Sequence, residues 1–215
     1  MRAMSNLFVG LCLTLIILGF GTMAYAEIVS RTDYKTHPVS GVTPAALVAS
    51  MKRHPIPDAG DEVVMGLLVM DSHFTYQPIR TRNGCRVGDM KTQVTFTIIL
   101  PRATHANRFD RVTKRLWNQF TDNVKGHELA HRQYFLEYAA AYERRARRIR
   151  AANCRGVDMA LARIAREEFN RAQRRNDRLD RKDGDAVTRQ PLFVAAERER
   201  PGLLASFQRP SHPTR

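Results

Sequence analysis

Cysteine is scarce in this chain of 215 residues, which contains only Cys12, Cys85 and Cys154. No two of them have the close paired spacing of zinc sites built from thiolates, so that class of metal site is disfavoured. Long apolar runs are also rare, and the run from Leu7 to Phe20 is shorter than the roughly 20 residues that a bilayer-spanning helix needs. Acidic residues number 21 against 35 basic ones, and the net charge of +14 indicates an anionic neighbour.

The first 26 residues have the three parts of a removable export signal. Arg2 provides a basic start, the apolar run follows, and small residues lead up to Ala26. We expect cleavage after Ala26, which leaves a periplasmic or secreted protein without a stable membrane anchor. The alternative is an uncleaved anchor, but glycines and a threonine interrupt the apolar run. Cys12 follows Leu11 rather than a small residue, which disfavours lipid attachment.

Cleavage of the signal leaves two cysteines, Cys85 and Cys154. Two thiols in an oxidising compartment usually form one disulfide, so we predict a bond between them. The alternative roles are a thiolate zinc ligand or a nucleophile. Neither cysteine lies in a paired metal-binding spacing, which makes the disulfide the better interpretation.

The basic excess is concentrated in the second half of the chain. Export points away from nucleic acid and toward envelope lipids, wall polymers or an acidic protein surface as a partner. The alternative is that the arginines form a solvated helix face without a specific partner.

The first half of the mature chain predicts one short helix followed by strands. Thr43 and Pro44 are typical of a helix start, and this helix should end near Arg53. After a turn rich in proline, residues 63–79 and 86–100 have strand composition, and the second of these segments alternates apolar and polar residues. The connector contains Asn83-Gly84 and predicts an antiparallel hairpin, with Pro101 ending its second strand.

The second half predicts two long helices. From Asn107 the apolar residues recur about every fourth position, and this stripe continues through His127 and His131 to Tyr138. A break is expected around Asn153–Gly156, after which a last helix should begin at Val157 or Asp158 and end at Gly184. The prediction is an α+β domain over residues 27–184, with helices packed on an antiparallel sheet. Residues 185–215, rich in arginine and proline, should form a mobile, disordered tail.

The sequence His127-Glu128-Leu129-Ala130-His131 has the HExxH spacing. Two histidines four apart on a helix can each place a ring nitrogen on one metal ion, and zinc suits two imidazoles. Zinc lowers the pKa of bound water, and Glu128 is placed to take its proton as a general base. The motif therefore predicts a catalytic zinc. The alternatives are two core histidines held by hydrogen bonds, or a metal that only stabilises the fold.

A catalytic zinc normally has three protein ligands, and the third is not marked by the motif. Glu137 would point away from His131 by about 120° on a continuous helix. Glu168 would lie roughly 16 Å along the axis from the histidines if the last two helices form a hairpin. The same hairpin brings residues 177–183 beside the motif, where Asp177 points outward. Asp180 and Asp183 lie near the inner stripe of the last helix, so one of these two is the expected third ligand.

From about Tyr34 to Gly184 the chain resembles a bacterial family of predicted secreted zinc-dependent proteases, catalogued as a domain of unknown function. The matching positions are Tyr34, Val39-Ser40-Gly41, Met51-Lys52-Arg53, Gly84-Cys85-Arg86-Val87, Leu100-Pro101-Arg102, His127-Glu128 and His131. The family often has a tryptophan where this chain has Ala103, and a His-Gly pair where it has Asp183-Gly184. The resemblance implies that Asp183 replaces that histidine if the histidine is a ligand, which makes Asp183 the preferred third ligand and Asp180 the alternative.

The function expected from the motif is hydrolysis of peptide bonds by an exported zinc metalloprotease, with a peptide or protein substrate. A non-catalytic, zinc-stabilised envelope protein that binds anionic polymer or lipid through its arginine-rich helices is the main alternative. Zinc-dependent amidase chemistry on peptidoglycan is a third possibility, because it needs the same site and differs only in substrate.

Overall fold

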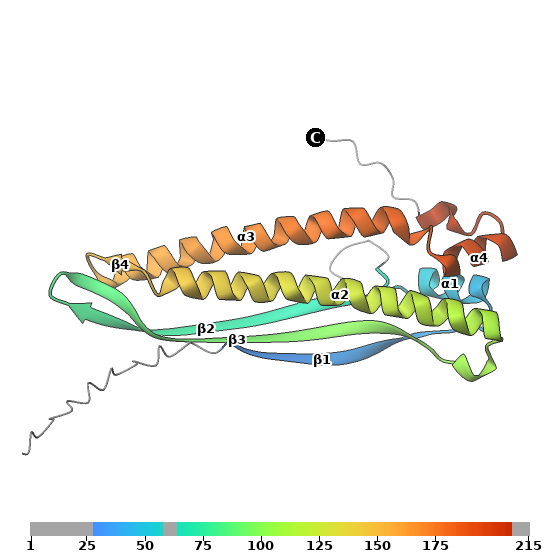
Figure 1. Ribbon diagram of the computed structural model, residues 1–215, viewed down its shortest axis with the longest axis horizontal. Helices are drawn as coiled ribbons and strands as arrows, with labels where there is room; N and C mark the ends of the chain where they lie inside the picture. Colours follow the sequence, from blue (N-terminus) through green and yellow to red (C-terminus); the bar gives the residue numbers. More distant parts are fainter. Residues whose placement is uncertain (1–27, 58–63, 208–215) are drawn as a thin grey trace, which may run out of the picture.

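Three long strands form a sheet that supports the helices. The computed structural model describes residues 28–57 and 64–207, so the expected export signal lies outside the described residues. The strands are β1 (Ile28–Val39), β2 (Leu67–Thr81) and β3 (Gly84–Ala103), in the order β1-β3-β2, and the short β4 (Arg150–Ala151) pairs with β3. Figure 1 shows how far the three strands run along the molecule.

The expected hairpin is present, and an unexpected strand joins it. β2 and β3 are antiparallel, with Thr81 opposite Gly84, whereas β1 pairs with β3 in parallel over its whole length. Along β3 buried and exposed side chains alternate from Met90 to Phe96. One face of the sheet is therefore covered by the helices. The predicted α+β class is confirmed, and β1 makes the sheet mixed rather than purely antiparallel.

The helices are α1 (Pro44–Arg53), α2 (Arg111–Ala146), α3 (Cys154–Val187) and α4 (Pro191–Glu199), with short 3₁₀ turns at Ala106–Arg108 and Leu204–Phe207. α2 runs along the sheet, and α3 returns beside it in the opposite direction (Figure 1). The predicted start of α1 is confirmed, because the Thr43 hydroxyl accepts a hydrogen bond from the backbone N–H of Ala46 at 3.3 Å. Among the described residues, no helix is both long and apolar enough to cross a membrane.

Three expected boundaries were wrong. β3 continues through Pro101 to Ala103, because beyond Ile99 it pairs only with β1 and has a free edge, where proline is tolerated. α3 begins at Cys154, since the Asn153 side chain accepts from the Gly156 N–H at 2.8 Å and caps the helix there. α3 also passes through Gly184 and ends at Val187.

The mobile tail predicted from residue 185 onward was wrong for the part that the structure describes. α4 buries three apolar side chains completely, and they join the same core as residues of α1 and α2. These side chains are Leu192, Phe193 and Ala196, each with 0% exposure. Tertiary burial thus orders a segment whose arginine and proline content had indicated disorder. Residues 208–215 lie outside the described residues.

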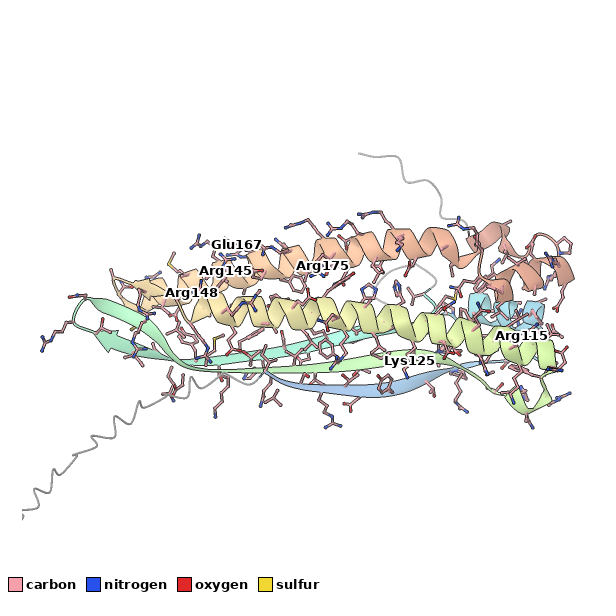
Figure 2. All side chains as sticks on the ribbon, in the orientation of Figure 1. Arg115, Lys125, Arg145, Arg148, Glu167 and Arg175 are labelled. Carbon is pink, nitrogen blue, oxygen red and sulfur yellow. A yellow bond between two sulfur atoms is a disulfide. The ribbon has the colours of Figure 1, made fainter. Side chains whose placement is uncertain are left out.

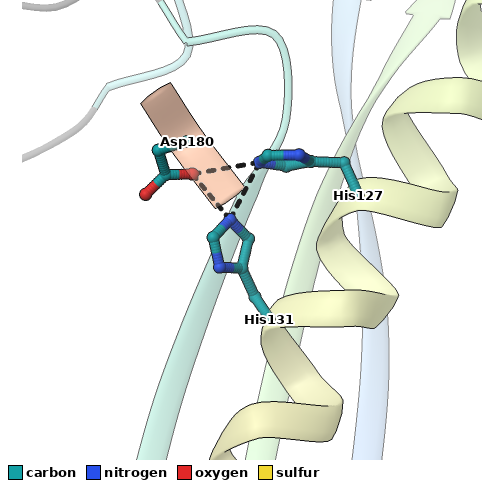
Figure 3. Close-up of side chains that lie close together, drawn as sticks. All are labelled: His127, His131 and Asp180. Atoms are coloured by element: carbon teal, nitrogen blue, oxygen red, sulfur yellow. Dashed lines mark hydrogen bonds and ion pairs between the residues drawn. The ribbon is translucent and has the colours of Figure 1, made fainter. Parts of the chain in front are cut away.

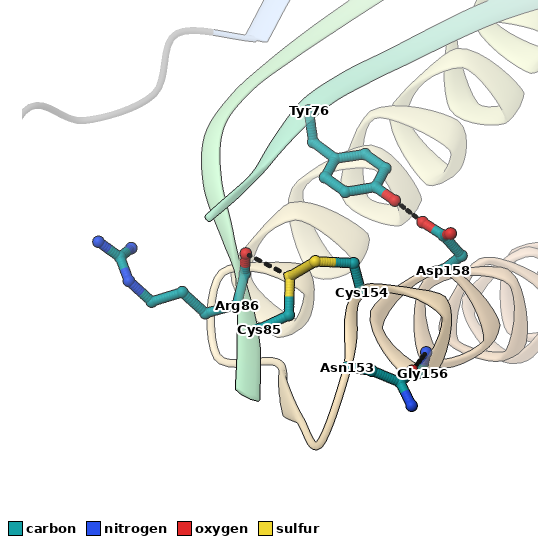
Figure 4. Close-up of a disulfide and its surroundings, with 7 residues drawn as sticks. All are labelled: Tyr76, Cys85, Arg86, Asn153, Cys154, Gly156 and Asp158. Carbon is teal, nitrogen blue, oxygen red and sulfur yellow. Dashed lines mark hydrogen bonds between the residues drawn. A yellow bond between two sulfur atoms is a disulfide. The ribbon is translucent and has the colours of Figure 1, made fainter. Parts of the chain in front are cut away.

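The predicted disulfide between Cys85 and Cys154 is confirmed. It joins the start of β3 to the start of α3, at the end of the molecule where β4 also pairs with β3 (Figure 4). Gly84 allows β4 to approach the start of β3 closely. Its φ is +132°, and a Cβ there would collide with the carbonyl oxygen of Ala151. The disulfide therefore fixes the hairpin end of the sheet to the second long helix.

A cluster of ion pairs around Arg145 connects α2 to α3. Arg145 contacts Glu167 and the buried Glu168, each at 2.6 Å (Figure 2). Arg147 pairs with Glu143 within α2 at 2.7 Å. Two arginines near the end of α2 thus form ion pairs with other residues of the fold.

Candidate metal centre

Two imidazole rings project from consecutive turns of α2 into the space between α2 and α3. Phe120 and Val124 lie on the same side of the helix and are buried, which confirms that the stripe continuing through His127 and His131 faces inward. The Nε2 atoms of the two rings are 2.8 Å apart. α2 therefore presents two adjacent ring nitrogens to the facing helix.

Asp180 of α3 completes a triangle with the two rings. Its Oδ1 lies 3.1 Å from Nε2 of His127 and 2.9 Å from Nε2 of His131. Figure 3 shows the carboxylate and both rings pointing toward one another. These three ligand atoms form a group that could hold a metal ion. The Asp180 side chain is 44% exposed and that of His131 is 13% exposed, so one side of the group is open to solvent.

The outer nitrogen of each ring also has a fixed partner on α3. Nδ1 of His127 lies 2.8 Å from Oδ2 of Asp183, and Nδ1 of His131 lies 2.8 Å from Oδ1 of Asn176. When each Nδ1 carries the proton and donates it, each Nε2 keeps its lone pair for a metal. Carboxylate and amide oxygens commonly orient metal-binding histidines in this way.

The spacing of the three atoms fits a small tetrahedral ion closely. Ligands at about 2.0–2.1 Å from zinc are about 3.3 Å apart at tetrahedral angles. The triangle has edges of 2.8, 2.9 and 3.1 Å, so each edge must widen by only a few tenths of an ångström. Two imidazoles and a carboxylate are a ligand set that zinc accepts, with a fourth position free for water.

The metal-free site holds one excess proton on its two rings and negative charge on Asp180. Burial favours the neutral form of His127, but its hydrogen bonds to Asp180 and Asp183 outweigh this effect and raise its pKa to about 9. Burial would likewise raise the pKa of Asp180, yet the hydrogen bonds from both histidines hold that pKa below its usual range. The same carboxylate that can bind a cation therefore stabilises a proton on the rings in its absence.

Glu128 lies beside the triangle and is 4% exposed. Burial raises the pKa of its carboxyl group, and the nearby charges of His127 and His131 oppose this rise. The segment leading into β2 forms one wall: a Cβ on Gly66 would lie 2.6 Å from Oε1 of Glu128. A buried carboxylate next to a possible metal position is the arrangement that a general base requires.

Most of the chain matches a known protein family. Residues 34–186 match the family described as "Bacterial protein of unknown function (DUF922)". The chain belongs to this family. The DUF922 region includes both histidines, Glu128 and Asp180, and it ends before α4. No curated protein and no solved structure matches the chain.

The structure separates the carboxylates that the sequence offered as a third ligand. Asp180, the alternative, faces both Nε2 atoms, whereas the preferred Asp183 contacts the outer nitrogen of His127. The two aspartates lie on neighbouring turns of one helix face, and helical phase alone does not distinguish them. Glu137 instead pairs with Arg175, and Glu168 pairs with Arg145.

Two contributors to the site were missed in the sequence. Asn176 lies one turn before Asp180 on the same face of α3, and this spacing is the signal that could have identified it. Gly66 lies far from the motif in sequence and approaches Glu128 only because β2 passes under α2. No local pattern could have indicated that contact.

Proposed function

We propose that this protein is an exported zinc metallopeptidase that hydrolyses peptide bonds with Glu128 as the general base. The observation that carries the proposal is the burial of Glu128 beside the ligand triangle of His127, His131 and Asp180. The region that matches the family contains all four residues. The disulfide is consistent with folding in an oxidising compartment, which supports export.

The chemistry divides between the metal and the chain. Zinc bound to the triangle would supply an acidified water and a Lewis acid for the scissile carbonyl. Glu128 accepts a proton from the water that attacks the carbonyl carbon. It then donates this proton to the leaving amine as the C–N bond breaks. Asp183 and Asn176 keep the two rings in the orientation that the ligand set needs.

The deciding experiment combines metal analysis with substrate cleavage. Zinc per chain is counted in the mature wild type, Glu128→Gln and Glu137→Gln, and each protein is incubated with a diverse peptide pool. Glu137 is a matched control, because it lies on the same helix and is exposed. We expect equal zinc in all three and loss of cleavage only in Glu128→Gln. Equal cleavage by Glu128→Gln and wild type would contradict the assigned role.

A second candidate function rests on the outward face of α3. Its exposed cations without an ion pair to another described side chain include Arg174, Arg178, Arg181 and Lys182. Cations three and four residues apart on a helix repel one another, so an anionic polymer or lipid would relieve an unfavourable arrangement. In this reading the zinc only stabilises the fold. Full zinc occupancy without cleavage of the peptide pool or of peptidoglycan, together with binding to an anionic polymer, would favour it.

Peptidoglycan is included as a substrate because amidase chemistry needs the same residues. A product released from peptidoglycan but not from the peptide pool, and lost in Glu128→Gln, would change the substrate class and retain the site.

A further inference from the structure

The half of α3 that carries the site contains little of the packing that normally holds a helix in place. The part of α3 up to Ala172 buries Val157, Leu161, Ile164 and Ala172 against the sheet and α2. Between Ala172 and the helix end, no described apolar side chain of α3 is fully buried, and Asn176 is the buried residue of this stretch. Val187, at the very end, is partly buried against the core that contains α4. Apolar burial is the main force that fixes helix positions. The site half of α3 therefore needs another anchor.

The polar contacts of this stretch are unsuited to that task. Asp180 and Asp183 are more than two-fifths exposed, and Arg175, which stacks on Tyr134 and pairs with Glu137, is 37% exposed. Ion pairs at such exposure contribute little to stability. The carboxylates also have to accept a small displacement when a cation enters. The positions of the two carboxylates therefore depend on the separation of α2 and α3 and do not fix that separation.

α4 provides the missing anchor directly after α3. Leu192 and Phe193 are fully buried in a core that also contains Leu47 and Val48 of α1. The ring of Phe193 lies 5.8 Å from that of Phe120, centroid to centroid, and Phe120 lies on the same inward face of α2 as His127. The end of α3 is thus tied to the helix that carries the imidazoles.

A hydrogen bond also connects α4 to α1. Oε2 of Glu199, the last residue of α4, accepts a hydrogen bond from the backbone N–H of Ala45 at 2.8 Å. This N–H belongs to the first turn of α1, where donors have no partner within the helix and a carboxylate is favourable. α4 is therefore held in two ways: its apolar face is buried in the core, and its last residue is hydrogen-bonded to α1. Figure 1 shows α1, α4 and the end of α3 gathered at one end of the molecule.

We infer that α4 is a clasp that sets the distance between α3 and α2 at the metal centre, with Leu192 and Phe193 as positioning residues for Asp180 and Asp183. The inference rests on the proposed metal site, and it extends the functional unit beyond residue 186, where the family match ends. Loosening the clasp lets the site half of α3 move away from the histidines. Metal affinity should then fall even while the protein remains folded, because a ligand must be held close to its metal-bound position.

The test compares the same substitution at two buried leucines in the full mature chain. Leu192→Ala loosens the clasp, and Leu161→Ala makes a cavity in α3 about 28 Å along the helix from Asp180. Zinc affinity is measured by chelator competition under conditions where thermal unfolding curves show both variants folded. Hydrogen exchange of residues 173–187 is followed in the metal-free proteins. Phe193→Leu replaces Leu192→Ala if the latter does not fold.

We expect Leu192→Ala to weaken zinc binding about 10- to 100-fold, the range seen when the supports of metal ligands are removed, and to speed exchange in residues 173–187. Leu161→Ala should change zinc affinity less than about twofold, since folded protein binds metal with its native affinity whatever the global stability. Equal affinities in the two variants would overturn the clasp and leave the peptidase proposal standing. Zinc binding without peptide cleavage would contradict the peptidase and leave the clasp standing. A wild type that binds no zinc would overturn both.

Discussion

Oδ2 of Asp183 lies 2.8 Å from Nδ1 of His127, the ring nitrogen that faces away from the ligand triangle. A carboxylate in this place orients the ring and increases the basicity of its other nitrogen. Asp180 and Asp183 have the same side chain and lie on neighbouring turns of α3, yet Asp180 faces Nε2 of His127 and Asp183 faces its Nδ1. This difference can be tested separately from any enzymatic activity.

Alanine substitution should distinguish the two aspartates by zinc affinity. Asp180→Ala removes a direct ligand from the triangle, so zinc binding should weaken by more than about 100-fold. Asp183→Ala should weaken it about 10- to 100-fold, because the ring loses its orienting partner and keeps its place on the metal. Chelator competition measures both values. A larger loss in Asp183→Ala than in Asp180→Ala would contradict the assignment.

Zinc binding should release a proton at neutral pH. The pKa of His127 is raised to about 9 in the metal-free site, and zinc requires the neutral ring. The Nε2 atoms of His127 and His131 lie 2.8 Å apart, so one donates to the other and they cannot both carry a proton there. Zinc affinity should therefore rise about tenfold per pH unit for the one displaced proton and level off above about pH 9. Calorimetry in buffers of different ionisation heat counts the protons.

The same shift gives the metal-free protein a defined stability profile. Because the folded pKa of His127 lies above the unfolded value of about 6.5, its protonation stabilises the fold. This stabilisation is complete below pH 6.5 and is lost as the pH rises through about 9. Urea unfolding of metal-free protein should show the decline over this interval. Replacing both His127 and His131 with alanine should remove it, because hydrogen bonds to Asp180 and Asn176 raise the pKa of His131 as well. A profile that is unchanged by the substitution would contradict this account.

The disulfide should affect stability without affecting the metal centre. Cys85 and Cys154 close a loop with a sequence separation of 69, for which chain entropy gives a stabilisation of about 4 kcal/mol. The bond joins the start of α3 to the sheet, at the opposite end of α3 from Asp180. Replacing both cysteines with alanine should lower the melting temperature by several degrees and leave zinc affinity in the folded protein unchanged. Calorimetry and chelator competition measure the two effects.

Local signals in the sequence were sufficient for several parts of the fold. Thr43-Pro44 predicted the start of α1 because capping depends on adjacent residues alone. The helical period predicted that His127 and His131 face inward, since burial of Phe120 and Val124 fixes the face of α2. The even pair of cysteines predicted the disulfide, because cleavage of the expected export signal would leave only these two thiols.

Other elements depend on contacts that no local pattern contains. β1 has mostly exposed side chains and pairs with β3, which lies far along the chain, so it has no clear apolar alternation. α4 is a short helix whose apolar residues become buried only because α1 and α2 meet there. Helical phase narrowed the choice of third ligand to Asp180 or Asp183. Which of the two faces the Nε2 atoms depends on how far α3 is shifted along its axis relative to α2, and the sequence does not contain that information.

Gly66 should control turnover through Glu128. A Cβ added at this position would lie 2.6 Å from Oε1 of Glu128 and 2.6 Å from Cγ1 of Val124. Val124 is buried in the core, so the end of the flexible Glu128 side chain is the group that must move.

A general base displaced by even a fraction of an ångström loses much of its advantage, so Gly66→Ala should lower kcat by about 10- to 100-fold. Zinc content should not change, because the atoms nearest to the added Cβ belong to Glu128 and Val124 and not to the three ligands. Gly126→Ala is the matched control, since a Cβ there meets no atom within 4 Å. Full activity in Gly66→Ala would show that Glu128 does not need its present position, and the assignment of Glu128 as the base would then have to be withdrawn.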